Sequence, residues 1–252
     1  MTGKLKKDGL EGAYSISSTL AGIDGPGRRI VRRLALRRLA SDDVDLAALS
    51  TFVDLEHLEI HGPAAVDLSV LGMLPRLTSV SLQGCRSVDL QALARVPALE
   101  SLILYDVASH PANGVAFSPT LRSLTIGVDD PSVPSTMLKD VVAALDWSAV
   151  PDLRSLMLVV GGVHDLPPVA LDLTFLRHLT RLERLDFAMG IVDASPDPSP
   201  LRPPFDGLSK HLRHVRFEVD GDAAAVQREL ATRMGVDPDG YDAPAISQRR
   251  AG

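Results

Sequence analysis

A six-residue pattern of apolar residues recurs along the chain and constrains its fold more than any other feature. Each copy reads apolar-x-x-apolar-x-apolar, and the eight copies begin at Val31, Leu55, Leu77, Leu99, Leu121, Leu153, Leu182 and Leu212. Their starts are separated by 24, 22, 22, 22, 32, 29 and 30 residues. Such a period is typical of a solenoid, in which each unit buries its apolar side against the next.

A second pattern lies between these copies and reads apolar-Asp-apolar-x-x-apolar. It occurs as Val44-Asp45-Leu46-Leu49, Val66-Asp67-Leu68-Leu71, Val88-Asp89-Leu90-Leu93 and Leu171-Asp172-Leu173-Leu176, with a weaker copy at Leu145-Asp146-Trp147-Val150. The aspartate can accept backbone N–H groups at the start of a helical turn. Apolar residues spaced by three then favour 3₁₀ or short α turns over a long helix.

Together the two patterns predict the architecture of one unit. The last two apolar positions of the first pattern alternate with polar ones, which is the period of a β-strand. We therefore expect an α/β solenoid of about eight units. Its parallel β-sheet forms the concave face, and its short helical or 3₁₀ segments form the convex face.

These residues resemble leucine-rich repeat proteins, in particular the short 22-residue class found in bacterial internalin-type domains. The resemblance covers roughly residues 30–220 and is strongest over 55–76 and 77–98. The family places Asn or Cys three residues after the strand core, where the side chain hydrogen-bonds along the solenoid. Cys85 occupies that position in one unit, and the resemblance therefore implies an inward-pointing thiol there.

The pattern divides the chain into three parts. Residues 1–29 do not match the repeat and are expected to form an N-terminal cap or arm. The repeat domain is predicted over 30–220, with a fuller helix at 136–145 and a proline-rich loop at 193–204. Residues 221–252 are predicted to hold a C-terminal capping helix, at 222–234, and a tail.

Composition excludes several classes of protein. Cys85 is the only cysteine, so the chain is not a disulfide scaffold, and no apolar run approaches the ~20 residues of a membrane helix. The N-terminal lysines are not followed by an apolar stretch, so we expect no export signal, no membrane association and a cytoplasmic location. The excess of arginine over lysine suggests a bacterial chain.

Catalytic and metal-binding patterns are missing from the sequence. The seven histidines form no His-Glu-x-x-His pattern, and neither a nucleophile elbow nor a phosphate loop occurs. A metal site at His57 and His61 and a nucleophilic Cys85 are alternatives, but exposed histidines and a buried thiol explain these residues as well. We expect no enzyme activity, no catalytic residue, no cofactor and no metal.

A cluster of arginines offers a different function. It consists of Arg28, Arg29, Arg32, Arg33, Arg37 and Arg38. The cluster could bind an anion or nucleic acid, or it could balance acidic neighbours on a solvated first unit. The net charge is −6, and aromatic residues are not interleaved with the arginines, so nucleic acid is the alternative rather than the expected partner.

The concave face is the default binding surface. Its outward positions mix acidic, small and basic residues, which suits a macromolecule better than a small substrate. We predict non-catalytic protein–protein recognition there, as an adaptor, an inhibitor or an immunity-type protein. The candidate partner-binding residues are Arg32, Glu56, His57, Glu59, Ser79, Ser81, Glu100, Ile103, Tyr105, Arg122, Arg154, Met157, Glu183, Asp186, Arg213 and Arg216.

Overall fold

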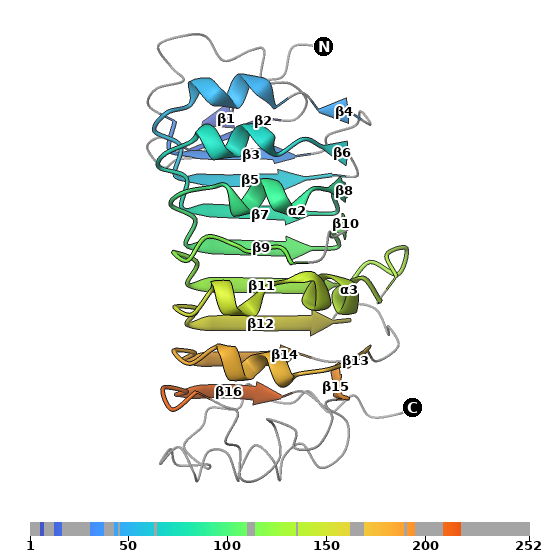
Figure 1. Ribbon diagram of the computed structural model, residues 1–252. Helices are drawn as coiled ribbons and strands as arrows, with labels where there is room; N and C mark the ends of the chain where they lie inside the picture. Colours follow the sequence, from blue (N-terminus) through green and yellow to red (C-terminus); the bar gives the residue numbers. More distant parts are fainter. Residues whose placement is uncertain are drawn as a thin grey trace.

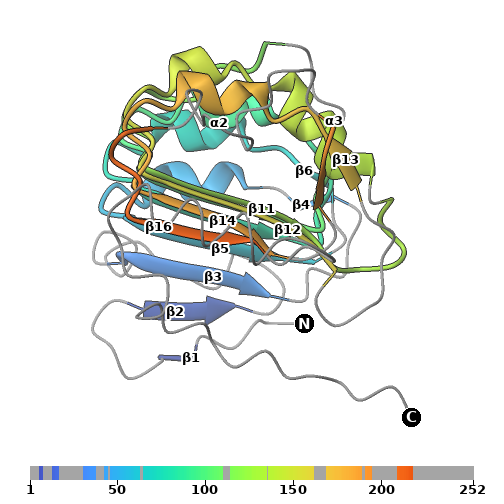
Figure 2. The same ribbon diagram turned by 90° about the horizontal axis from the view of Figure 1, so that it is seen from below.

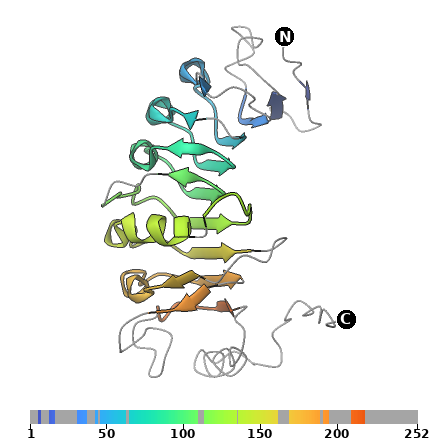
Figure 3. The ribbon, with the colours of Figure 1, turned by 90° about the vertical axis from the view of Figure 1, so that its right-hand side faces the viewer.

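The chain forms a curved stack of parallel strands backed by short helices (Figures 1 and 3). The computed structural model describes residues 6–7, 13–16, 31–37, 43–44, 46–62, 65–109, 114–134, 136–161, 169–188, 191–194 and 209–217. The predicted helix at 222–234 and residues 195–204 of the predicted loop lie outside these ranges.

Within the described ranges, the main sheet has ten strands in the order β1-β2-β3-β5-β7-β9-β11-β12-β14-β16. Their bounds are Lys6–Lys7, Ala13–Ile16, Arg33–Arg37, His57–His61, Ser79–Gln83, Ser101–Tyr105, Ser123–Val128, Ser155–Val160, Arg184–Ala188 and His214–Phe217. Among the described strands, only β1 and β2 pair antiparallel. Each copy of the apolar pattern supplies one strand of this sheet from β3 to β16, so the predicted α/β solenoid with a parallel sheet is confirmed.

Strand register is kept across every unit, whatever the length of the unit. Leu58, Val80 and Leu102 are aligned on adjacent strands, and the alignment continues to Leu185. Ahead of each strand, one carbonyl accepts two N–H groups of the next unit, as Arg32 O does from Glu56 (2.8 Å) and His57 (2.9 Å). The longer spacings after Leu121 therefore add chain outside the sheet and leave the strands in line.

Alternate strand residues point into one continuous core. On β5, for example, Leu58 and Ile60 are buried, whereas His57, Glu59 and His61 keep partial exposure on the other side of the sheet. The stack bends so that this other side is the concave face (Figure 3). On the convex side, the rings of Trp147 and Phe175 stack with their centroids 4.2 Å apart.

The convex side carries the predicted helical turns (Figure 2). They are η2 (Ala47–Thr51), η3 (Ser69–Met73), α2 (Leu90–Ala94), α3 (Thr136–Ala144), η4 (Trp147–Ala149) and η5 (Thr174–His178). Four of these six are 3₁₀ helices, and α3 is the predicted longer helix. Asp67, Asp89, Asp146 and Asp172 each accept the N–H of the residue two positions on, at 2.9–3.0 Å. The predicted acceptance of an N–H group at the start of a helical turn is confirmed at these four positions, and at α2 and η4 the aspartate is also the N-cap residue. Asp45 lies outside the described residues.

Two small parallel sheets join the concave and convex layers. One has the order β10-β8-β6-β4 and the other pairs β13 with β15. The bounds of β4, β6, β8, β10, β13 and β15 are Asp43–Val44, Ala65–Val66, Arg86–Val88, Ala108–Ser109, Val169–Leu171 and Ile191–Asp193. The apolar residues before Asp45, Asp67, Asp89 and Asp172 lie on them, whereas Leu145, before Asp146, forms an isolated parallel bridge with Val115. Each of these strands has only two or three residues, which is too short to show an alternation of apolar and polar residues. The sequence therefore did not reveal them.

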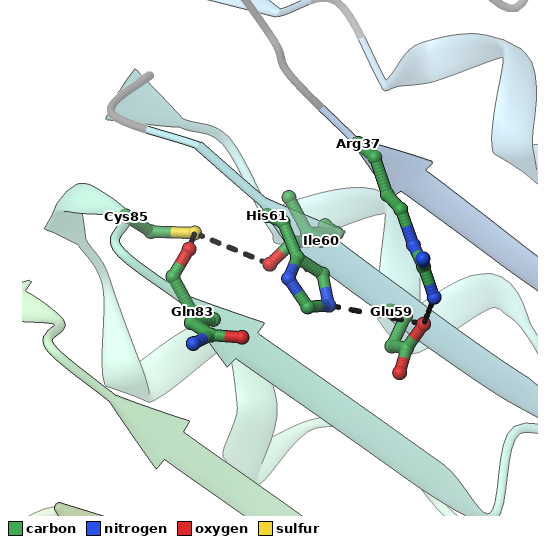
Figure 4. Close-up of polar contacts among 6 residues, drawn as sticks. All are labelled: Arg37, Glu59, Ile60, His61, Gln83 and Cys85. Carbon is green, nitrogen blue, oxygen red and sulfur yellow. Dashed lines mark hydrogen bonds and ion pairs between the residues drawn. The ribbon is translucent and has the colours of Figure 1, made fainter. Parts of the chain in front are cut away.

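Cys85 points inward, as the resemblance implied. Its side chain is fully buried, and its thiol lies 3.8 Å from the Ile60 carbonyl oxygen and 3.7 Å from that of Gln83 (Figure 4). The Ile60 contact joins one unit to the preceding one. Burial raises the pKa of the thiol to about 11, so the nucleophilic thiolate is scarce at neutral pH.

Candidate functional site

The concave face consists of three aligned rows on the strands and one row just before them. The first row holds Arg33, His57, Ser79, Ser101, Ser123, Ser155, Arg184 and His214. The second holds Ala35, Glu59, Ser81, Ile103, Thr125, Met157, Asp186 and Arg216. The third holds Arg37, His61, Gln83, Tyr105, Gly127 and Val159. The edge row holds Arg32, Glu56, Thr78, Glu100, Arg122, Arg154, Glu183 and Arg213.

The two acidic candidates on the second unit are engaged in ion pairs. Arg32 Nε lies 3.8 Å from Glu56 Oε1, and Arg37 Nη2 donates to Glu59 Oε2 at 3.3 Å. His61 Nε2 lies 3.8 Å from the same Glu59 oxygen (Figure 4). Two arginines of the predicted anion-binding cluster thus balance carboxylates of the neighbouring strand. Arg28, Arg29 and Arg38 lie outside the described residues.

His57 lies beside this network in the first row. Its pKa is lowered, mainly because burial disfavours the charged imidazolium and also because the Arg33 guanidinium is close. The Glu56 carboxylate opposes the shift. At neutral pH His57 is therefore a neutral hydrogen-bonding group on this part of the face.

The centre of the face is small and partly apolar. The first row there is a run of four serines, on β7, β9, β11 and β12. The second and third rows place Ile103, Tyr105 and Met157 on β9 and β12, with Ile103 36% exposed. We call these three residues the central apolar patch. Between their strands lies Gly127, where an added Cβ would come within 2.6 Å of Tyr105 Cζ, so the tyrosine ring lies across the glycine.

Contacts with the next unit fix both Tyr105 and the residue that follows it. The Tyr105 ring covers Gly127, and the next residue, Asp106, has a left-handed φ of 51°. The Asp106 carboxylate accepts the N–H groups of Asp129 (2.6 Å) and Asp130 (2.8 Å), which fixes the turn after β11. Burial, with the Asp129 and Asp106 carboxylates, raises the pKa of Tyr105. The residue therefore presents a neutral phenol at the edge of the patch.

Asp186 organises the C-terminal end of the face. Its side chain is almost fully buried, and its two oxygens contact Arg184 Nε at 2.6 Å and His214 Nε2 at 2.9 Å. Both partners lie in the first row and are more exposed than the aspartate. Asp186 therefore orients Arg184 and His214 and does not offer a free carboxylate to a partner.

Arg184 and His214 are residues that the sequence analysis missed. They occupy the third position of the apolar-x-x-apolar pattern, the same position as His57 and Ser79 in earlier units. Extending that row to the last two strands would have found them. The structure places the other candidates on the concave face or its edge row, and for Arg216 only the backbone position is described.

Metal-ligating side chains are not clustered in the described part of the chain. Within it, no group of three His, Cys, Asp or Glu side chains is arranged to hold a metal ion. His57 and His61 lie on one face of β5, four residues apart, in the first and third rows. Of the helices in the described ranges, none has the length and apolar character needed to cross a bilayer.

Comparisons of the chain with known proteins found similarity to solved structures only. No family model matches it, and no curated protein matches it in sequence. Among solved structures it is similar to internalin C2 of Listeria monocytogenes, with 18% identity and a TM-score of 0.44, over 83% of this chain and 75% of that one. It is also similar to an internalin (inlF) of the same species, with 17% identity and a TM-score of 0.39, over 85% of this chain and 64% of that one.

Proposed function

We propose that the chain is a non-catalytic protein-recognition module that binds its partner through the concave face. The observation that carries this proposal is the extent of the face. Eight strands spaced ~4.8 Å apart make it roughly 34 Å long, which matches a protein partner better than a small ligand. Its mixture of ion pairs, hydroxyl groups and partly exposed apolar side chains is typical of protein interfaces.

Rigid support strengthens the proposal. The face is one hydrogen-bonded sheet over a continuous core, so its side chains start from fixed positions. Binding then costs little backbone ordering, which leaves more of the contact energy for affinity. We propose a role in the cytoplasm as an adaptor, an inhibitor or an immunity-type neutraliser, which rests on analogy between folds.

Affinity capture from a lysate of the source organism, with and without nuclease, tests the proposal. The concave variant is Ser81→Arg/Thr125→Arg, which places two bulky side chains at the centre of the face. The matched control is Ser69→Arg/Thr136→Arg, the same two changes on exposed positions of η3 and α3. Melting curves establish that both variants fold like the wild type.

We expect one protein to be captured by the wild type and by the control, to resist nuclease and to be lost from the concave variant. Capture that survives in the concave variant would contradict binding through this face. Capture that disappears with nuclease would favour the alternative function, nucleic-acid binding by the arginine cluster.

A further inference from the structure

The concave face has a charge balance opposite to that of the chain. Over the whole sequence, 32 acidic residues outnumber 26 basic ones. On the face and its edge row, the described side chains include seven arginines and five carboxylates. They are Arg32, Arg33, Arg37, Arg122, Arg154, Arg184 and Arg213, with Glu56, Glu59, Glu100, Glu183 and Asp186. Positive charge is therefore concentrated where the proposed function places the partner.

Internal pairing neutralises most of these charges and leaves the excess of two arginines among unpaired side chains. Four of the five carboxylates already contact arginines, in the pairs Arg32–Glu56, Arg37–Glu59, Arg154–Glu183 and Arg184–Asp186. Among the residues that the structure describes, Arg33, Arg122 and Arg213 form no ion pair, and Glu100 is the one carboxylate of the face without one. Three arginines thus remain available to an incoming partner, against one carboxylate.

One of these arginines lies on the unit between the strands of the central apolar patch, three residues or about 10 Å ahead of the register of Ile103 and Met157. Arg122 immediately precedes β11, the strand between β9, which carries Ile103 and Tyr105, and β12, which carries Met157. Arg213 precedes β16, two strands beyond β12, at a separation of roughly 10 Å along the stack. Exposed apolar side chains with arginines at their border are enriched at the centres of protein interfaces.

We infer that the partner is an acidic protein surface that places an apolar side chain on the central apolar patch and carboxylates on Arg122 and Arg213. This inference rests on the proposed function. A nucleic acid fits less well, because its phosphates would also meet Glu100 and the carboxylates paired along the edge row. An acidic protein can leave these positions to neutral groups and use the apolar patch, which a phosphate backbone cannot.

A selection from randomised peptides displayed on yeast tests the inference. Peptides that bind the Ser81→Arg/Thr125→Arg variant are first removed, and peptides that bind the wild type are then enriched. These enriched peptides are one probe, and a single-stranded DNA of mixed sequence is the other. Net charge and apolar content of the enriched peptides are compared with those of the starting library. Binding is measured at physiological ionic strength, because low salt exaggerates surface attraction.

We expect the enriched peptides to be acidic and to carry an aliphatic or aromatic residue. Arg122→Glu/Arg213→Glu should weaken the best of them by about tenfold or more, since repulsion replaces attraction. Ile103→Ser/Met157→Ser should weaken them by a similar factor. The matched controls lie on the convex side. Arg95→Glu/Lys139→Glu makes the same change in charge and Met73→Ser removes an exposed apolar side chain, and both should stay within about twofold.

Neutral or basic peptides, or controls that weaken binding as much as the concave variants, would overturn the inference. Tighter binding of the DNA than of any peptide would overturn it in favour of a nucleic acid. These outcomes are separate from failure of the proposed function. A protein captured through the concave face that the Arg122→Glu/Arg213→Glu variant still binds would leave protein recognition standing and remove only the acidic partner.

Discussion

At the scale of single residues, the contact between Tyr105 and Gly127 shapes the centre of the concave face. A Cβ at position 127 would lie 2.6 Å from Tyr105 Cζ, so Gly127→Ala must push the ring away. We expect the variant to lose about 1 kcal/mol of unfolding free energy, measured by urea denaturation. Because the ring moves into water, the raised pKa of Tyr105 should fall toward its ordinary value in an ultraviolet titration.

A variant that lacks the Tyr105 ring provides the control for this prediction. In a Tyr105→Ala chain, the added methyl group has room, so Gly127→Ala should cost less than it does in the wild type. Equal costs in the two backgrounds would show that the ring contact is not the cause.

The buried thiol gives a second prediction for a single residue. The pKa of Cys85 is raised to about 11, so the folded chain holds this proton more tightly than the unfolded chain does. Its contribution to stability is complete below the ordinary pKa of 9.0 and is lost as the pH rises through about 11. We expect an alkaline loss of stability in the wild type that is smaller in Cys85→Ala, measured by denaturation at several pH values.

Alkylation of the same thiol checks its burial directly. Iodoacetamide should label Cys85 only as fast as the chain unfolds, and urea should accelerate the labelling. Labelling of the native protein at the rate of a free cysteine would contradict the inward position of the side chain.

At the scale of elements, the repeated aspartate is predicted to stabilise each helical turn that it caps. Asp89 accepts the N–H of Gln91 at 2.9 Å at the start of α2. Asp89→Ala should lower the unfolding free energy by about 1 kcal/mol, whereas Asp89→Asn, which keeps an accepting oxygen, should lower it less. Thermal melts of the two variants make the comparison, and equal losses would contradict a capping role.

Strand β9 offers a test of the alternation between core and surface. Leu102 is fully buried and Ile103 is partly exposed on the opposite face. Leu102→Asp should unfold the stack, because it buries a charge without a partner. Ile103→Asp should leave a cooperative melt close to that of the wild type. Leu82→Asp should unfold the stack in the same way as Leu102→Asp. Retained cooperative melting in either leucine variant would contradict the core assignment.

At the scale of the whole molecule, the sequence allowed prediction of the elements that recur in every repeat unit. The apolar pattern predicted the eight main-sheet strands from β3 to β16. The repeated aspartate predicted the acceptors at the starts of helical turns, Asp67, Asp89, Asp146 and Asp172. Strand β2, which continues the sheet before β3, was missed because Glu11 occupies the first apolar position of its unit.

Charge pairing across the face could not be predicted in the same way. The partners Arg37 and Glu59, or Asp186 and His214, are 22 and 28 residues apart, and they meet only because the units are in register. The burial of Asp186 depends on how its neighbours fold over it, which a one-dimensional pattern does not contain. Residue types on the concave face could therefore be assigned from the sequence, whereas their free or paired state required the structure.

The central claim is that the concave face contacts a protein partner, and site-specific photocrosslinking during affinity capture tests it most directly. A benzophenone amino acid replaces Thr78, Gln83 or Arg154 at the border of the concave face, and Met73 or Lys139 on the convex side. We predict that the three concave positions crosslink to one and the same protein and that the convex positions do not. Crosslinks from the convex positions alone would contradict the account.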